Sequence, residues 1–271
     1  MTRFIANARM YAVAPEAEAA WQALIAHVAA EAEVALDYEP YPAPQPLEVL
    51  WRRPDLGLVQ MCGYPIALRI ADVVPIAAPI PALDWAQGRA AYRSDLIVRA
   101  DSSFIRLEDT FGHRVGWTVT HSHSGFNAPR YHLLPHRRAD GAPLYRESLG
   151  NLVTARAVLD AVLAGRIEVG PLDAYWHALI AQYRPGITAG IRVLESTALA
   201  PMPAFVASPA LPAEAVARLR ASFAAAATRP WFTPHAAALR LAGFAPVTQA
   251  DFAKTLEWDR AAVAAGYPIP A

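Results

Sequence analysis

The sequence of 271 residues has little of several features that common protein functions require. It contains one cysteine, which excludes a disulfide framework and a thiolate metal cluster. Its 24 basic side chains balance 24 acidic ones, and this neutrality argues against binding nucleic acid through bulk electrostatics. Lysine occurs only at position 254, and we attribute the predominance of arginine to compositional bias rather than to recognition.

No segment is long and apolar enough to predict a membrane-spanning helix. The most apolar window, 70–86, is interrupted by two aspartates and three prolines. A secretory signal is also missing, because Asn7 and Arg9 interrupt the first apolar stretch and Glu16 follows soon after. We therefore expect a protein without a membrane span that either works in the cytoplasm or has lost a leader.

Several motifs that would fix a function are absent from the sequence. It has neither a glycine fingerprint for dinucleotides nor a P-loop, so the usual phosphate cradle of nucleotide chemistry is missing. It also lacks a Gly-x-Ser-x-Gly nucleophile elbow and any known zinc or calcium spacing. We expect no cofactor.

Strand and helix patterns alternate along the chain, which predicts an α/β fold. Strands are expected over 5–13, 34–38 and 55–62, with helical segments between them. This order favours a parallel sheet covered by helices. Further along, 114–120 reads as a buried strand and 149–164 as a helix with one apolar face.

The stretch Thr118–Arg130 carries the most chemical information, because a buried strand there runs into a Ser/His/Gly turn. A helix is expected to begin near Ser124, and the first amides of a helix point outward at the positive end of its dipole. Ser122 and Ser124 add hydroxyl donors, and Gly125 lets a ligand approach the backbone closely. These features predict an uncharged site for phosphate-like or carboxylate groups. Simple capping of the helix explains the two serines equally well.

A cluster of histidines raises a metal site as an alternative, because five of the eight fall within 113–136. His121 and His123 would share one side of an extended strand. A proline breaks the helical spacing between His132 and His136, however, and no acidic residue lies among the last four histidines of this cluster. We therefore expect no metal.

Cys62 lies at the end of an expected strand, where open α/β sheets bind their ligands. A nucleophilic thiol is one interpretation, and a small buried apolar residue is the commoner one. Tyr64, Tyr92 and Tyr175 lie at other strand ends or loops, where packing and ligand contact are both open.

Six blocks in a defined order resemble the phosphonate/phosphate-type substrate-binding proteins of ABC transporters. They are Leu58–Pro65, Tyr92–Arg99, Leu107–Val115, Ser122–Gly125, Ala164–Gly170 with Asp173, and Pro201–Pro203. No single block is specific, but their order and spacing together are. The resemblance extends from about Met10 to the C-terminus.

The resemblance implies the type 2 periplasmic-binding-protein fold, with two α/β lobes joined by a two-strand hinge. Each lobe would hold a mixed, mostly parallel sheet flanked by helices. Lobe one would comprise 1–94 and 193–271, lobe two 95–192, with the ligand cleft between them. The implied function is capture of a small anionic or zwitterionic solute, such as a phosphonate, a phosphate or another oxyanion-bearing solute, by hinge closure for ABC-type uptake. A periplasmic monomer that meets a transporter permease, and not an enzyme, is expected.

The resemblance also implies which residues bind the ligand. The turn would hold the anionic group, and other aromatic and acidic residues would complete the site: Tyr64, Tyr92, Ser122, His123, Ser124, Gly125, Asp173 and Tyr175. Two departures leave the ligand open, because Thr154-Ala155 stands where the family has a histidine and His123 replaces a threonine. The alternatives are an enzyme on the same scaffold, using Cys62 or a cleft histidine, and a cytoplasmic ligand sensor.

Overall fold

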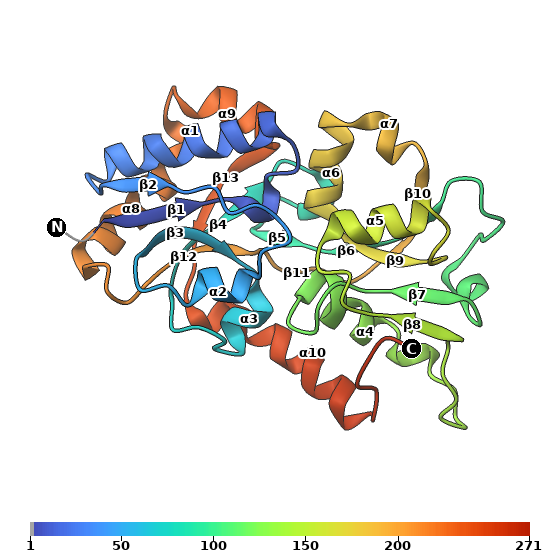
Figure 1. Cartoon of the computed structure of the whole chain (residues 1–271). Helices are drawn as coiled ribbons and strands as arrows, with labels where there is room; N and C mark the ends of the chain where they lie inside the picture. The colour runs from blue at the N-terminus through green and yellow to red at the C-terminus, as the bar shows by residue number, and fades with distance from the viewer. Residues whose placement is uncertain (1–2) are drawn as a thin grey trace. The chain divides into compact units, whose positions relative to one another are not determined.

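The computed structural model describes residues 3–271, which divide into two compact units (Figure 1). Unit 1 comprises Met1–Tyr92 and Pro201–Ala253, and unit 2 comprises Arg93–Ala200 and Lys254–Ala271. The chain therefore passes between the units three times, whereas the expected hinge has two strands. Among the described residues, no helix combines the length and apolar character needed to cross a membrane.

Unit 1 is built on a six-stranded sheet with the order β13-β4-β12-β3-β1-β2. Its strands are β1 (Phe4–Asn7), β2 (Leu36–Tyr38), β3 (Leu56–Met61), β4 (Val74–Pro81), β12 (Ala204–Ala207) and β13 (Leu241–Pro246). Strand β1 pairs in parallel with β2 and β3, whereas β12 and β13 pair antiparallel with their neighbours. The expected mostly parallel sheet is thus found only around β1, because strands of the returning segment run the opposite way.

Helices cover this sheet and bury apolar side chains against one another. Helices α1 (Pro15–Glu31), α8 (Ala213–Ala225) and α9 (Phe232–Leu239) are in mutual contact or contact the sheet, and α2 (Leu47–Trp51) contacts β3. Helix α1 begins at Pro15, where the first turn needs no amide donor. The Trp51 indole donates to the Gln60 carbonyl at 3.0 Å and so anchors α2 to the strand that leads into α3 (Gly63–Ala67).

Unit 2 has a three-stranded antiparallel sheet, with β6 (Ser94–Arg99) between β9 (Gly170–Asp173) and β10 (Ile191–Ser196). A second, parallel pair joins β7 (Arg114–Gly116) to β8 (Glu147–Leu149), and an isolated bridge links Val115 to Val169 beside β9. Two short strands, β5 (Ala91–Tyr92) and β11 (Ala200–Pro201), lie at crossings between the units. The helices are the π-helical turn η4 (His123–Asn127), α4 (Ala128–His132), α5 (Ala155–Leu163), α6 (Ala174–Tyr183), α7 (Pro185–Thr188) and α10 (Ala253–Ala264), together with short 3-10 turns.

Side-chain hydrogen bonds explain where two expected elements differ from the structure. The strand expected over 5–13 ends at Asn7, whose side chain accepts the Arg9 amide at 2.8 Å and donates to the Glu39 carbonyl at 2.7 Å. The helix expected over 149–164 begins only after Thr154, whose hydroxyl accepts the Ala157 amide at 3.0 Å.

A buried cation fastens the C-terminal segment to unit 2. The side chain of Arg130 is 4% exposed and contacts the carboxylate of Asp259 on α10. Its guanidinium also donates to Asn127 Oδ1 and to the Pro268 carbonyl, each at 3.1 Å. These bonds explain why Lys254–Ala271 packs with unit 2; the lobe boundaries at 94/95 and 192/193 stay a prediction about which segments move together.

We expect Asp259→Ala to lower the free energy of unfolding by about 3 kcal/mol, because it leaves a buried guanidinium without its counter-ion. The matched control is Asp160→Ala, which breaks an exposed pair with Arg156 and should cost about 0.5 kcal/mol or less. Urea denaturation of the two variants measures both values. Equal losses would show that the Arg130 pair contributes no more than a surface pair.

Candidate functional site

The Ser122–Gly125 turn follows β7 and folds back on the chain that precedes it. The Ser122 hydroxyl accepts the Gly125 amide at 3.0 Å, so this serine caps η4, as one of the two interpretations expected. The Thr118 amide donates to the Gly125 carbonyl at 3.1 Å and closes the loop. Because η4 and α4 are both short, the helix dipole at this turn is weak. An anion here would be held mainly by hydrogen bonds from hydroxyl and amide groups.

The missing side chain of Gly125 makes room for Thr118. A Cβ atom added at Gly125 would lie 2.0 Å from Thr118 Oγ1 and 2.7 Å from Thr118 Cγ2. The sequence suggested that this glycine admits a ligand to the backbone. In the structure, the close neighbour is a buried side chain of the same unit.

We expect Gly125→Ala to destabilise the protein by about 1–3 kcal/mol, because overpacking forces neighbours to shift. Thr118→Ala removes the two closest atoms and should recover part of that loss in the double variant. Thermal denaturation of the four proteins of this cycle measures the coupling. Purely additive losses would show that Thr118 is not what Gly125 accommodates.

The side chain of His123 is buried in unit 2, at 1% exposure. Its ring stacks on Trp258 of α10, with centroids 5.2 Å apart, and Nδ1 accepts from Asn127 Nδ2 at 3.2 Å. Burial, with a smaller contribution from the Lys254 charge, lowers the pKa of His123 to about 3. The imidazole is therefore neutral at neutral pH.

A neutral buried histidine makes stability depend on pH in one direction. Because its folded pKa lies below the unfolded value of about 6.5, the unfolded chain binds the extra proton as pH falls through this window. The stability is complete above the unfolded pKa and is lost towards pH 3, at up to about 1.4 kcal/mol per pH unit. We expect His123→Phe to reduce the dependence of the unfolding free energy on pH between pH 6 and 4, by up to that slope. An unchanged slope in urea titrations would contradict the assignment.

Asp173 ends β9 and caps α6. Its Oδ1 accepts the amides of Tyr175 at 2.9 Å and Trp176 at 3.0 Å, and both Asp173 and Tyr175 are buried. Strand β9 contacts η4 within unit 2, so the structure brings Asp173 and the Ser122–Gly125 turn into neighbouring elements. The carboxylate of Asp173 and the hydroxyl and amide groups of the turn therefore belong to elements that contact one another.

The other expected residues belong to unit 1. Tyr64 lies in α3 and Tyr92 in β5, and both side chains are buried. Cys62, also buried, has its Sγ 3.4 Å from the Tyr92 hydroxyl. The structure thus brings Cys62 and Tyr92 together in one unit, and Asp173 and the turn together in the other.

The residues that pack against the Ser122–Gly125 turn and η4 were not identified from the sequence. Asn127 donates to the Thr255 carbonyl at 2.8 Å, and Trp258 carries the His123 ring. Lys254 donates to the Leu199 carbonyl at 3.1 Å, with its ammonium 5.4 Å from the Trp258 ring centre. No local pattern signals the contacts of Asn127 with Thr255 and of His123 with Trp258, because each pair is more than a hundred residues apart in the sequence.

The histidines of the cluster pair with different carboxylates. His132 Nε2 lies 3.1 Å from Glu195 Oε1, and His136 Nδ1 lies 3.7 Å from Glu108 Oε1. Within residues 3–271, no group of three or more His, Cys, Asp or Glu side chains is arranged to hold a metal ion.

A family model described as "ABC transporter, phosphonate, periplasmic substrate-binding protein" matches residues 11–252. No curated protein sequence matches the chain.

Several solved structures share the fold at low sequence identity. A binding-protein component of an ABC phosphonate transporter from Pseudomonas aeruginosa is 16% identical, with a TM-score of 0.77 over 94% of this chain and 85% of that one. PhnD1 from Prochlorococcus marinus, solved with methylphosphonate, is 13% identical, with a TM-score of 0.78 over 96% and 98%. A Xanthomonas citri protein solved with ATP is 18% identical, with a TM-score of 0.67 over 98% of each chain. These likenesses confirm the expected fold class.

Proposed function

The chain belongs to the family of periplasmic substrate-binding proteins of ABC phosphonate transporters, and we propose that its own ligand is a small phosphonate-like solute that also carries an amine. Family members deliver solutes for uptake and are not enzymes, so catalysis by Cys62 is not favoured. A periplasmic location and a permease partner extend from the family to this chain as part of the proposal. The observation that carries the proposal is the contact between β9, which ends at Asp173, and the Ser122–Gly125 turn.

The turn supplies the anion-binding half of the proposed site. The Ser122 hydroxyl and the Gly125 amide bond to each other, so the hydroxyl and amide of Ser124 are the proposed donors to the phosphonate oxygens. The His123 side chain is neutral and turned to the Trp258 ring, so in this proposal it supports the turn rather than contacting the ligand. The phosphonate group would be recognised by hydrogen bonds, because the turn contains no positively charged side chain.

Asp173 supplies the reason to favour a zwitterion. A carboxylate beside an anion site repels a simple dianion, whereas an amine on the same ligand would gain a charge-assisted hydrogen bond. The same carboxylate also caps α6, where its Oδ1 accepts the two helix amides.

Tyr64 and Tyr92 of unit 1 are the proposed contacts from lobe one. A ligand that touches residues of both units would favour a closed form through its differential affinity for the two states. A monomeric receptor that closes in this way can present a distinct shape to a permease.

The experiment compares methylphosphonate with aminomethylphosphonate, which differ only in the amine. We expect the aminated ligand to bind wild type more tightly, and Asp173→Asn to weaken it about tenfold or more while sparing or improving methylphosphonate. Asparagine also caps helices well, so this variant removes the charge and keeps the α6 cap. Isothermal titration calorimetry gives the affinities, and Ser124→Ala should weaken both ligands by about 1–3 kcal/mol.

Two controls separate binding from folding and closure. Ser122→Ala should lower apo stability by about 1 kcal/mol through the lost cap, whereas Ser124→Ala should hardly change it. Small-angle scattering should show a smaller radius of gyration with aminomethylphosphonate. Failure of both phosphonates to bind would reject the ligand class, and binding without compaction would reject the closure mechanism.

A further inference from the structure

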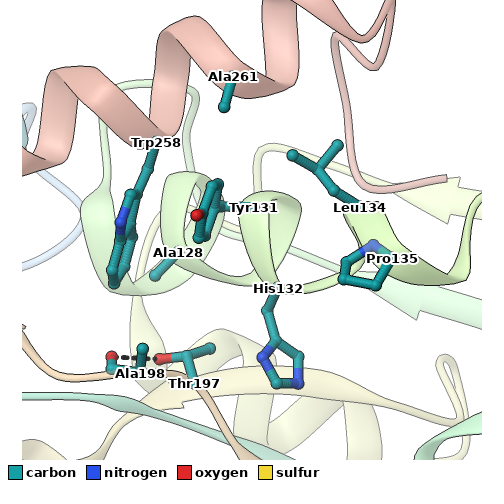
Figure 2. Close-up of a pocket in the computed structure, with 9 residues that line it drawn as sticks. All are labelled: Ala128, Tyr131, His132, Leu134, Pro135, Thr197, Ala198, Trp258 and Ala261. Atoms are coloured by element: carbon teal, nitrogen blue, oxygen red, sulfur yellow. Dashed lines mark hydrogen bonds between the residues drawn. The ribbon is translucent and has the colours of Figure 1, made fainter.

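A pocket of about 400 Å³ lies within unit 2, and none of the expected ligand residues lines it (Figure 2). Three segments form its walls: α4 with the residues that follow it, the 197–198 segment, and α10. Two of these segments lie close to points where the chain passes between the units, at 200/201 and 253/254. The volume falls within the range of pockets that hold small organic ligands.

An aromatic pair dominates one wall of this pocket. The rings of Tyr131 and Trp258 lie 4.9 Å apart at centroid and are parallel to within 2°. Figure 2 shows both rings below α10, with Ala261 above them and Ala128 beside them. This wall offers π surface and methyl groups.

The two polar side chains of the other walls, Thr197 and His132, lie against polar atoms of the protein. The Thr197 hydroxyl accepts the Ser94 amide at 3.0 Å and donates to the Ala198 carbonyl at 3.2 Å. His132 Nε2 lies 3.1 Å from Glu195 Oε1, and burial lowers the pKa of His132, so its ring is uncharged at neutral pH. A wall of this kind gives water few partners and rewards an apolar guest.

We propose that this pocket binds uncharged aromatic molecules of one or two rings. An aromatic ligand can pack against the Tyr131–Trp258 wall and the surrounding methyl groups. Such a ligand does not require hydrogen bonds from the pocket walls. A charged guest would gain little, because no side chain that lines the pocket carries a charge at neutral pH. The inference does not depend on the phosphonate-type ligand proposed above.

The test titrates indole into the full chain by isothermal titration calorimetry. Wild type should bind one indole, and Ala261→Leu should weaken binding about tenfold or more because leucine fills the space beside the ring wall. Ala264→Leu is the matched control, since it makes the same change on an exposed face of the same helix. Loss of indole binding in Ala261→Leu but not in Ala264→Leu supports the site. No binding to wild type, or equal binding by both variants, overturns it.

A second variant keeps the proposal falsifiable if Ala261→Leu fails to fold by circular dichroism. Tyr131→Leu preserves an apolar wall but removes one ring, so indole affinity should fall several-fold while the aliphatic probe n-hexanol is unaffected. If n-hexanol binds wild type as tightly as indole, or if Tyr131→Leu leaves indole affinity unchanged, the aromatic ligand class is wrong.

Discussion

The buried guanidinium of Arg130 is the constraint on which the rest of unit 2 depends. A desolvated cation needs a counter-ion and hydrogen-bond acceptors, and here Asp259, Asn127 Oδ1 and the Pro268 carbonyl supply them to its two terminal nitrogens. Two of these partners lie in the last segment of the chain, so the charge fixes α10 against η4 and α4. The Trp258 ring is thereby held in place, and with it the His123 ring that stacks upon it.

The same packing decides how the candidate site handles charge. Burial keeps His123 neutral, and the Ser122–Gly125 turn presents hydroxyl and amide groups while Asp173 brings the one carboxylate. In the proposed site, charge complementarity would therefore come largely from the ligand itself. The substitution of histidine for the threonine that the family resemblance implies has a structural reason here: the larger ring reaches Trp258 and Asn127 and joins the turn to α10.

Local signals in the sequence predicted much of this fold, but they did not predict pairings between residues far apart in the chain. The strand-helix alternation, the Ser122 cap and the presence of a helix within 149–164 follow from capping and periodicity, although its start at Thr154 was missed. The antiparallel entry of β12 and β13 and the Arg130–Asp259 pair do not, because partners far apart in sequence leave no periodic trace. At Gly125 the glycine itself was visible, but its neighbour Thr118 was not.

Lys254, which touches the Leu199 carbonyl and lies near the Trp258 ring, has a practical consequence. It is the chain's only lysine and the first residue after the passage at 253/254. Apart from the terminal amine, an acylating dye would meet a single exposed ammonium group. The molecule thus carries its own attachment point for an optical reporter at a crossing between its two units, without an engineered cysteine.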